Sequence, residues 1–354
     1  MNQTVHKSLL LIAVFLLPLT AMAQTASWEK STEAADRAKA EGRVEEAEQL
    51  YRQVLKQAER FGEKDPRLSI TLIDLALVCN AQGKSEEAEA LANRSLLVIS
   101  KATNSFKSLK PKTSSEDEYK KVEVTVDILD RAAGLFLQNA KYAEAEPPYK
   151  LIVSIREEAL RKSDKPKGNE YFLGALVQMT TGGHEKLLTA YDHLATLYRA
   201  EKKNEDAETL YKKSLGLEDE ANAQDKPRYA TMLNKLGDLY FDDRKFAEAE
   251  SLYKRAYTIN LKSLGPKSPE IASGFGRLAT IYVEQGKNAE AVSFFESALA
   301  VYQQANWSDK PETATTLERY ASLLKKLGQE TKAASLLDRA TAIRKGQSHA
   351  ATRP

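Results

Sequence analysis

The sequence predicts an all-α protein, a solenoid of about seven helix-turn-helix repeats. Three observations lead to this fold class. A motif returns every 42 residues, as its leading residues Leu194, Leu236 and Leu278 show. Within each copy, apolar residues recur at three- and four-residue steps, which places them on one face of a helix. Proline also stands at one fixed step before successive copies, at Pro227, Pro269 and Pro311.

Four consecutive copies are regular. The first reads Leu194-Ala195-x-Leu197-Tyr198 and is followed by Ala207-Glu208-x-Leu210-Tyr211. The fourth begins Tyr320-Ala321-x-Leu323-Leu324 and keeps the same register. A small residue follows the leading one each time, so a partner helix can approach closely. Each copy therefore predicts a first helix, a tight turn and a second helix.

Three earlier copies are looser. They are marked by an Ala-Glu pair early in the second helix: Ala47-Glu48, Ala88-Glu89 and Ala145-Glu146. The opening helix of the first repeat is expected near residues 28–41. Glycine interrupts several copies where the chain must turn, at Gly83, Gly286 and Gly328. Because one helical pair cannot bury its own apolar face, the repeats must stack on one another.

Residues 1–23 read as a secretory signal peptide. Lys7 precedes an apolar run from Leu9 to Leu19, and Ala21-Met22-Ala23 offers small residues for cleavage after Ala23. An uncleaved membrane anchor is the alternative, because the uncharged stretch continues to Ser27. We therefore expect an exported bacterial protein, periplasmic or secreted, that meets the membrane only through an uncleaved signal.

Two insertions flank the third repeat. The first is polar, rich in Ser and Lys, and predicts a mobile loop. The second contains an apolar segment, residues 171–177, which is read as a docked short helix, a strand or a partner-binding flap. The predicted organisation is a signal peptide 1–23, repeats one and two 24–101, a loop 102–121, an irregular third repeat 122–161, an insertion 162–183, repeats four to seven 184–345 and a flexible tail 346–354.

Pro147 and Pro148 fall inside the second helix of the third repeat. Proline lacks the amide hydrogen and clashes with the preceding helical turn, so we predict a kink or a delayed helix start. Together with the insertions, these prolines predict a joint. Two stacks, residues 28–101 and 184–345, would meet there with a bend.

The repeats resemble the tetratricopeptide repeat. The family pattern is met in the fifth copy by Leu233, Leu236, Gly237, Tyr240, Ala249 and Tyr253. The 42-residue period is similar to that of the kinesin light chains, whose second helix is extended. The resemblance implies a right-handed superhelix whose first helices line a concave groove. It also implies that Asn234 occupies the place of a residue that grips a bound peptide's backbone.

A basic or titratable residue precedes the Leu-small pair in five successive repeats. We call these residues the basic row: Arg131, His193, Lys235, Arg277 and Arg319. The first two repeats carry acids there instead, Glu33 and Asp74. The row, together with Asp192 and Asn234, is the predicted binding site, a series of donors for the carboxylates or carbonyls of an extended peptide. The alternative is a solvated helix face whose neighbouring acids neutralise the bases.

Other chemistry is not predicted. Positive and negative residues nearly balance, with 52 Lys and Arg against 50 Asp and Glu, so no attraction to nucleic acid follows. His184 and His193 are not spaced to share a metal, and we expect no metal and no cofactor. Cys79, the only cysteine, falls on an apolar helix face and predicts a core residue.

The predicted function is that of a non-enzymatic scaffold or adaptor in the cell envelope. It would bind a protein or peptide partner in the concave groove. One alternative is a chaperone-like or assembly component for envelope proteins, which an exposed apolar patch near residues 171–177 would favour. A remote alternative is an unfamiliar enzyme or a carbohydrate-binding module, which would need a deep pocket with converging polar groups.

Overall fold

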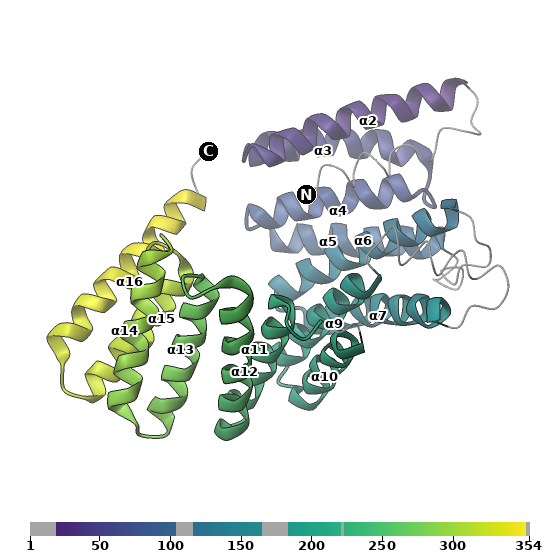
Figure 1. The fold of residues 1–354 in the computed structure, drawn as a ribbon. Coiled ribbons are helices and arrows are strands. Elements are labelled where there is room, and N and C mark those ends of the chain that lie inside the picture. Colours follow the sequence, from purple (N-terminus) through teal and green to yellow (C-terminus); the bar gives the residue numbers. More distant parts are fainter. Residues whose placement is uncertain (1–18, 104–115, 165–182, 221–222, 352–354) are drawn as a thin grey trace. The chain divides into compact units, whose positions relative to one another are not determined.

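A computed structural model describes residues 19–103, 116–164, 183–220 and 223–351 of the chain. Within these ranges the regular structure is helical and no strand occurs, which confirms the predicted all-α solenoid of helix-turn-helix repeats. The helices of the described residues follow one another as seven pairs, separated inside each pair by a short turn (Figure 1). Each pair corresponds to one copy of the sequence repeat.

Each pair consists of a first and a second helix. The first helices are α2 (Leu19–Ala40), α4 (Pro66–Ala81), α6 (Glu116–Gln138), α9 (Gly183–Ala200), α11 (Pro227–Asp242), α13 (Pro269–Glu284) and α15 (Pro311–Lys326). The second helices are α3 (Val44–Ala58), α5 (Ser85–Ala102), α7 (Tyr142–Asp164), α10 (Asn204–Glu220), α12 (Phe246–Leu264), α14 (Asn288–Gln304) and α16 (Glu330–Ala351). One 3₁₀ turn, η2 (Glu59–Phe61), follows α3.

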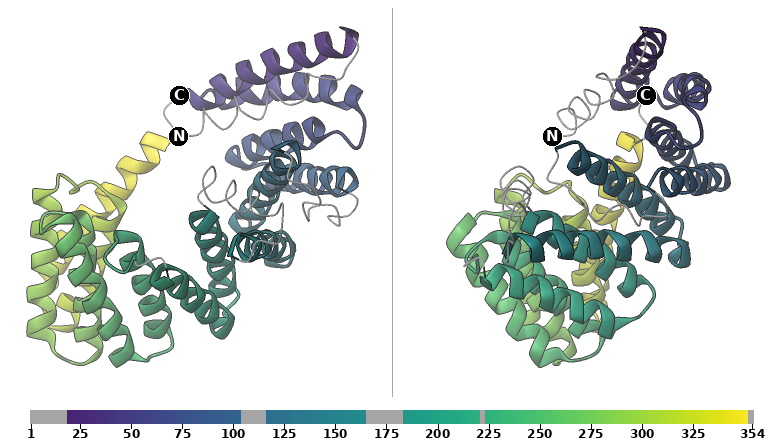
Figure 2. Two further views of the ribbon diagram at one scale, coloured as in Figure 1. Left: turned by 45° about the vertical axis from the view of Figure 1, so that its right-hand side comes forward. Right: turned by 90° about the vertical axis from the view of Figure 1, so that its right-hand side faces the viewer.

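The chain divides into two compact units. Unit 1 comprises residues 1–201 and unit 2 comprises residues 202–353. In unit 1, α6 packs on α4, α5 and α7, and α7 packs on α9. In unit 2, α10 to α16 pack one after another (Figure 2). The division falls at the turn after α9, between the two helices of the fourth repeat.

Local signals in the sequence set where the helices begin and turn. Four first helices have proline at their first position, where the missing amide hydrogen costs nothing. The turn glycines have positive φ angles, such as +75° at Gly83 and +74° at Gly286. In three other repeats Ala140, Lys202 and Arg244 take the same left-handed conformation at about +60°. The predicted tight turns are therefore present even where glycine is absent.

The small residue of the motif lets the helices of a pair approach closely. In the fifth repeat it is Gly237, and a Cβ atom placed there would lie 2.6 Å from the Tyr253 ring. The equivalent positions elsewhere hold buried alanines, among them Ala76, Ala195 and Ala279. Leucines and aromatic rings pack around these contacts and form the core.

The third repeat differs from its prediction in one respect. Helix α7 begins at Tyr142, directly after the turn, so a delayed start at Pro147 and Pro148 is wrong. The two prolines lie inside the helix and remove two of its backbone hydrogen bonds. Buried contacts just beyond them, at Tyr149 and Ile152, hold this helix against its neighbours. The kink stays a prediction.

Three predicted segments differ in extent. Helix α6 begins at Glu116, so residues 116–121 are helical rather than part of a loop. Helix α16 continues to Ala351, so residues 346–351 are helical rather than a flexible tail. Helix α2 begins at Leu19, inside the predicted signal peptide. The remainder of the signal, of the first loop and of the second insertion, including residues 171–177, lies outside the described residues. Among the described helices, none is both long and apolar enough to span a membrane.

Candidate functional site on the first helices

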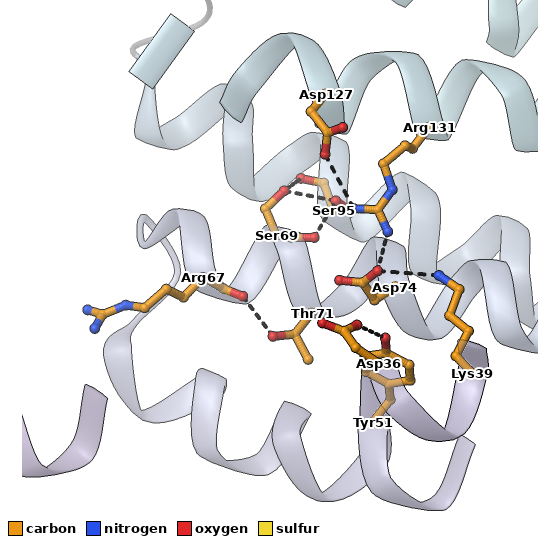
Figure 3. A network of polar contacts seen from close by, with 10 residues as sticks. All are labelled: Asp36, Lys39, Tyr51, Arg67, Ser69, Thr71, Asp74, Ser95, Asp127 and Arg131. Atoms are coloured by element: carbon orange, nitrogen blue, oxygen red, sulfur yellow. Dashed lines mark hydrogen bonds and ion pairs between the residues drawn. The ribbon is translucent and has the colours of Figure 1, made fainter. Parts of the chain in front are cut away.

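In unit 1, the position of the basic row connects the first helices of three successive repeats (Figure 3). Asp74 on α4 is the centre of this network, and its side chain is only 2% exposed. One of its oxygens accepts a hydrogen bond from Arg131 on α6 and lies 3.7 Å from the Lys39 amine on α2. Arg131 also pairs with Asp127 one helical turn away, at 3.4 Å. The predicted ligand-binding residue Arg131 is thus committed to a contact between repeats.

His193 makes the corresponding contact between the third and fourth repeats. Its Nδ1 atom lies 2.7 Å from an oxygen of Asp130 on α6. Its ring packs against Tyr149 of α7, with 5.7 Å between the ring centres. The side chain is about one third exposed. Its neighbour Asp192, also a predicted site residue, is half-buried and makes contacts within the fold.

In unit 2, Arg277 on α13 pairs with Asp238 on α11. Its Nε and Nη2 atoms lie 3.0 and 3.3 Å from the two carboxylate oxygens, a two-pronged contact. Tyr253 of α12 donates a 2.7 Å hydrogen bond to the same carboxylate. Burial, aided by the negative charge of Asp238, raises the pKa of Tyr253 and keeps the phenol protonated. Asp238 is 29% exposed, so this network reaches the surface.

Arg319 on α15 is the least committed member of the basic row. Its position is equivalent to that of Arg277, but the previous repeat offers Thr280 where Asp238 stands. A single hydrogen bond of 3.5 Å joins the Arg319 Nη1 atom to the Thr280 hydroxyl. The side chain is exposed. Most of its guanidinium donors therefore face solvent.

The remaining predicted residues lie on α11. Lys235 is half-buried and makes contacts within the fold. Asn234 is half-buried, and its side-chain oxygen is buried without a hydrogen-bond partner among the described residues. A backbone amide of a bound peptide is the kind of donor that such an oxygen accepts.

The predicted site omits Asp238, the carboxylate that holds Arg277, and its equivalent in the first repeat, Asp36. Asp36 and Asp238 stand three residues after the row position in the first and fifth repeats. Each accepts a hydrogen bond from a tyrosine fifteen residues later, Tyr51 and Tyr253 respectively. The signal that could have found them is this common Asp-to-Tyr spacing, which neither of the other regular repeats in unit 2 keeps.

A second row of polar contacts runs along the turns. At each interface up to the sixth repeat, the glutamate of the Ala-Glu pair accepts a hydrogen bond from a side chain of the next repeat. In the first repeat this side chain is the lysine in the turn of the second repeat. Glu208 illustrates this, since Tyr240 donates to it at 2.8 Å and Lys212 pairs with it at 2.6 Å. The equivalent glutamates are Glu48, Glu89, Glu146 and Glu250, with partners Lys84, Asn139, Tyr198 and Gln285. This contact explains why glutamate follows alanine so regularly.

The interface before the last repeat replaces these polar groups together. Val292 stands in place of the glutamate and Leu324 in place of the tyrosine. Both belong to an apolar cluster in which Phe295 stacks on Tyr320 with 5.4 Å between ring centres. Both partners of the polar contact are therefore replaced by apolar residues, so neither is left buried without a hydrogen bond.

A third polar cluster holds α6, α7 and α9 together. Glu123 receives two hydrogen bonds from Arg156, one of 3.0 Å, and pairs with Lys186 at 2.5 Å. Burial alone raises the pKa of Glu123, but the hydrogen bonds and charges of the two bases outweigh it and hold the pKa at about 2. The carboxylate is thus ionised at neutral pH.

Comparison with known families agrees with the repeat reading. Profiles described as the tetratricopeptide repeat match residues 32–96, 187–217, 228–304 and 270–346, which together cover more than half of the chain. The chain belongs to the tetratricopeptide repeat family. Tetratricopeptide repeats generally serve as non-enzymatic scaffolds for contacts between proteins. No curated protein matches the sequence.

Solved structures with the tetratricopeptide architecture resemble the fold. The crystal structure of BtubC (BKLC) from P. vanneervenii is 22% identical, covers 75% of this chain and 92% of its own, and has a TM-score of 0.52. The apo form of RapI is 10% identical, covers 91% and 99% respectively, and has a TM-score of 0.54. A putative kinesin light chain from Podosopora anserina is 21% identical over 63% and 96%, with a TM-score of 0.48. At these identities the likeness shows the fold alone.

Proposed function

We propose that this tetratricopeptide protein is an exported scaffold or adaptor of the bacterial cell envelope. Its first helices in unit 2 would hold a peptide or protein segment. The observation that carries the proposal is the uncommitted guanidinium of Arg319, in a row where the other arginines are paired with carboxylates. A partner's carboxylate or backbone carbonyl would supply the acceptor that Thr280 only partly provides.

Export is supported by where packing begins. The first buried side chain described is Thr25, whose hydroxyl accepts a 2.6 Å hydrogen bond from Arg67 on α4. Trp28 is also buried and donates a 3.1 Å hydrogen bond to Thr71. Ala23 and Gln24 are exposed. Cleavage after Ala23 would therefore leave every one of these contacts in place.

Cell fractionation followed by N-terminal sequencing tests the export. We expect the mature chain in the periplasm or medium, beginning at Gln24. Replacing Ala21 and Ala23 with larger residues would block processing and leave the protein on the membrane. Recovery of the full-length chain in the cytoplasm would contradict the proposal.

The partner's chemistry is tested with an array of extended peptides that differ in net charge. We expect the mature chain to retain acidic peptides and to lose them when Arg319 is changed to Glu. Affinity capture from the native envelope fraction with the same two proteins then asks whether a natural partner follows the array. Equal retention of acidic and basic peptides would remove the basic row from consideration.

A further inference from the structure

Cys79 occupies a position that is tyrosine in three later repeats. The equivalent residues are Tyr198, Tyr240 and Tyr282, each five residues after the row position. In two of them the phenol reaches back to the glutamate of the previous repeat, at 3.4 and 2.8 Å. Cysteine is too short to act as the phenol does. In the second repeat a thiol therefore takes the place of the phenol, close to Glu48 of the previous repeat.

Three ligand-type atoms come together at this place. Glu48 of α3, Cys79 of α4 and Glu87 of α5 each offer one, and all lie within 4.8 Å of one another. Cys79 is fully buried, and its thiol has no hydrogen bond with any described residue. Glu87 is 41% exposed, so the cluster opens to solvent on one side. Because each group comes from a different helix, packing of the first two repeats places them together.

We propose that Glu48, Cys79 and Glu87 form a binding site for a divalent metal ion of the zinc class. One thiolate and two carboxylates suit such an ion, and solvent would supply the fourth ligand on the Glu87 side. Tetrahedral zinc with ordinary bond lengths separates its sulfur and oxygen ligands by about 3.6 Å. Side-chain rotation must therefore bring the three atoms closer together to hold an ion.

Two carboxylates and two bases surround the thiol. Glu48 and Glu87 attract a divalent ion, whereas Arg52 and Lys84 oppose it, so an ion gains the attraction of the carboxylates as it displaces these bases. Binding forms the metal–sulfur bond as the S–H bond breaks, so one proton leaves to solvent for each ion bound.

Two cations now hold the carboxylates and must be displaced. Arg52 pairs with both glutamates at 2.7 and 2.6 Å, and Lys84 pairs with Glu48 at 2.7 Å. Both side chains are more than 40% exposed, but Glu48 is only 12% exposed, so displacing them from this carboxylate is the main cost of binding. The lysines equivalent to Lys84 lie over tyrosine rings in two later repeats, Lys245 at 5.2 Å and Lys287 at 5.5 Å. A turn lysine therefore does not need the glutamate.

Titration of the mature chain with Co²⁺ tests the site. We expect one ion per chain, a thiolate-to-cobalt charge-transfer absorption, competition by Zn²⁺, and release of about one proton per ion. Cys79→Ser abolishes the charge-transfer absorption while its circular dichroism remains that of a folded chain. Glu87→Gln weakens binding by more than about tenfold. Lys84→Gln, which removes a competing cation, tightens it.

Glu208→Gln is the matched control, because Glu208 is the equivalent of Glu48 beside a tyrosine. It should leave cobalt binding unchanged. Absence of the charge-transfer absorption at saturating Co²⁺ would overturn the proposal, as would its persistence in Cys79→Ser. A Lys84→Gln variant that only loses stability and gains no affinity would identify the cluster as an ion-pair network and would also overturn it.

Discussion

The first and fifth repeats each contain a hydrogen bond from a tyrosine to an aspartate. The repeat that follows carries residues of opposite charge at the row position, Asp74 after the first repeat and Arg277 after the fifth. Asp36 and Tyr51 in unit 1 are the equivalents of Asp238 and Tyr253 in unit 2. Arg277, from the repeat after the fifth, pairs with Asp238. Asp74, from the repeat after the first, instead pairs with Lys39 of the first repeat and Arg131 of the third.

The two units differ in how much of the row position is used in contacts between repeats. In unit 1 the buried acid Asp74 joins three successive first helices through one carboxylate oxygen, while its other oxygen is buried without a hydrogen-bond partner among the described residues. In unit 2 the same position is nearer to solvent and ends in Arg319, which has only a threonine. The row position therefore makes buried contacts between repeats in unit 1, whereas in unit 2 its last member, Arg319, is exposed with one contact to Thr280. The predictions below test that contrast.

The largest expected effect is the loss of Asp74. Asp74→Ala leaves the Arg131 guanidinium without its buried counter-ion, and we expect it to destabilise the protein by about 3–5 kcal/mol. Asp238→Ala removes the carboxylate shared by Arg277 and Tyr253 in unit 2, where both charged partners are more than a quarter exposed, and should cost less, about 1–2 kcal/mol. Urea unfolding of the two variants measures this. Equal losses in the free energy of unfolding would mean that the two networks stabilise the protein equally and would contradict this prediction.

Acid should weaken unit 1 through Glu123. Its folded-state pKa of about 2 lies below the ordinary value of 4.5, so its contribution is present above pH 4.5 and is lost as the pH falls toward 2. The shift corresponds to about 3 kcal/mol at neutral pH. Glu123→Gln should lower stability at pH 7 and flatten the profile between pH 5 and 2. A variant profile parallel to that of the wild type would contradict the assignment.

A smaller effect is expected from the close approach in the fifth repeat. Gly237→Ala would place its Cβ against the buried Tyr253 ring, and should cost about 1–3 kcal/mol. Gly216 lies within α10 with no atom near its Cβ position. Gly216→Ala is the control and should stabilise by about 0.5–1 kcal/mol, because alanine favours helix. Thermal unfolding should therefore shift in opposite directions for the two alanines.

Much of the fold could be predicted because the repeats reinforce one another. The 42-residue step, the proline before each first helix and the small residue at each close contact recur in register, so errors in one copy are corrected by the others. Prediction failed where only one copy carried the signal. Pro147 and Pro148 looked like a helix start, but burial of the following residues kept α7 continuous from Tyr142. The predicted tail likewise held no residue strong enough to end α16 before Ala351.

The candidate site could be predicted only in part. Periodicity places the basic row at one position of the repeat on successive first helices. It does not show what each base meets, because the partners come from another repeat, 39 to 63 residues away. Whether Arg131 meets Asp74 or Arg319 meets only Thr280 depends on residues that vary from copy to copy. The Ala-Glu pair carried a readable signal, since its regular recurrence indicates a contact repeated at each interface up to the sixth repeat.

Matched charge reversals at two ends of the basic row test the central contrast most directly. Arg131→Glu and Arg319→Glu are compared for thermal stability and for retention of acidic peptides. We expect Arg131→Glu to lose stability, because it places a second acid beside buried Asp74. Arg319→Glu should keep the wild-type unfolding temperature and lose the peptides. Wild-type peptide retention by folded Arg319→Glu would contradict the account.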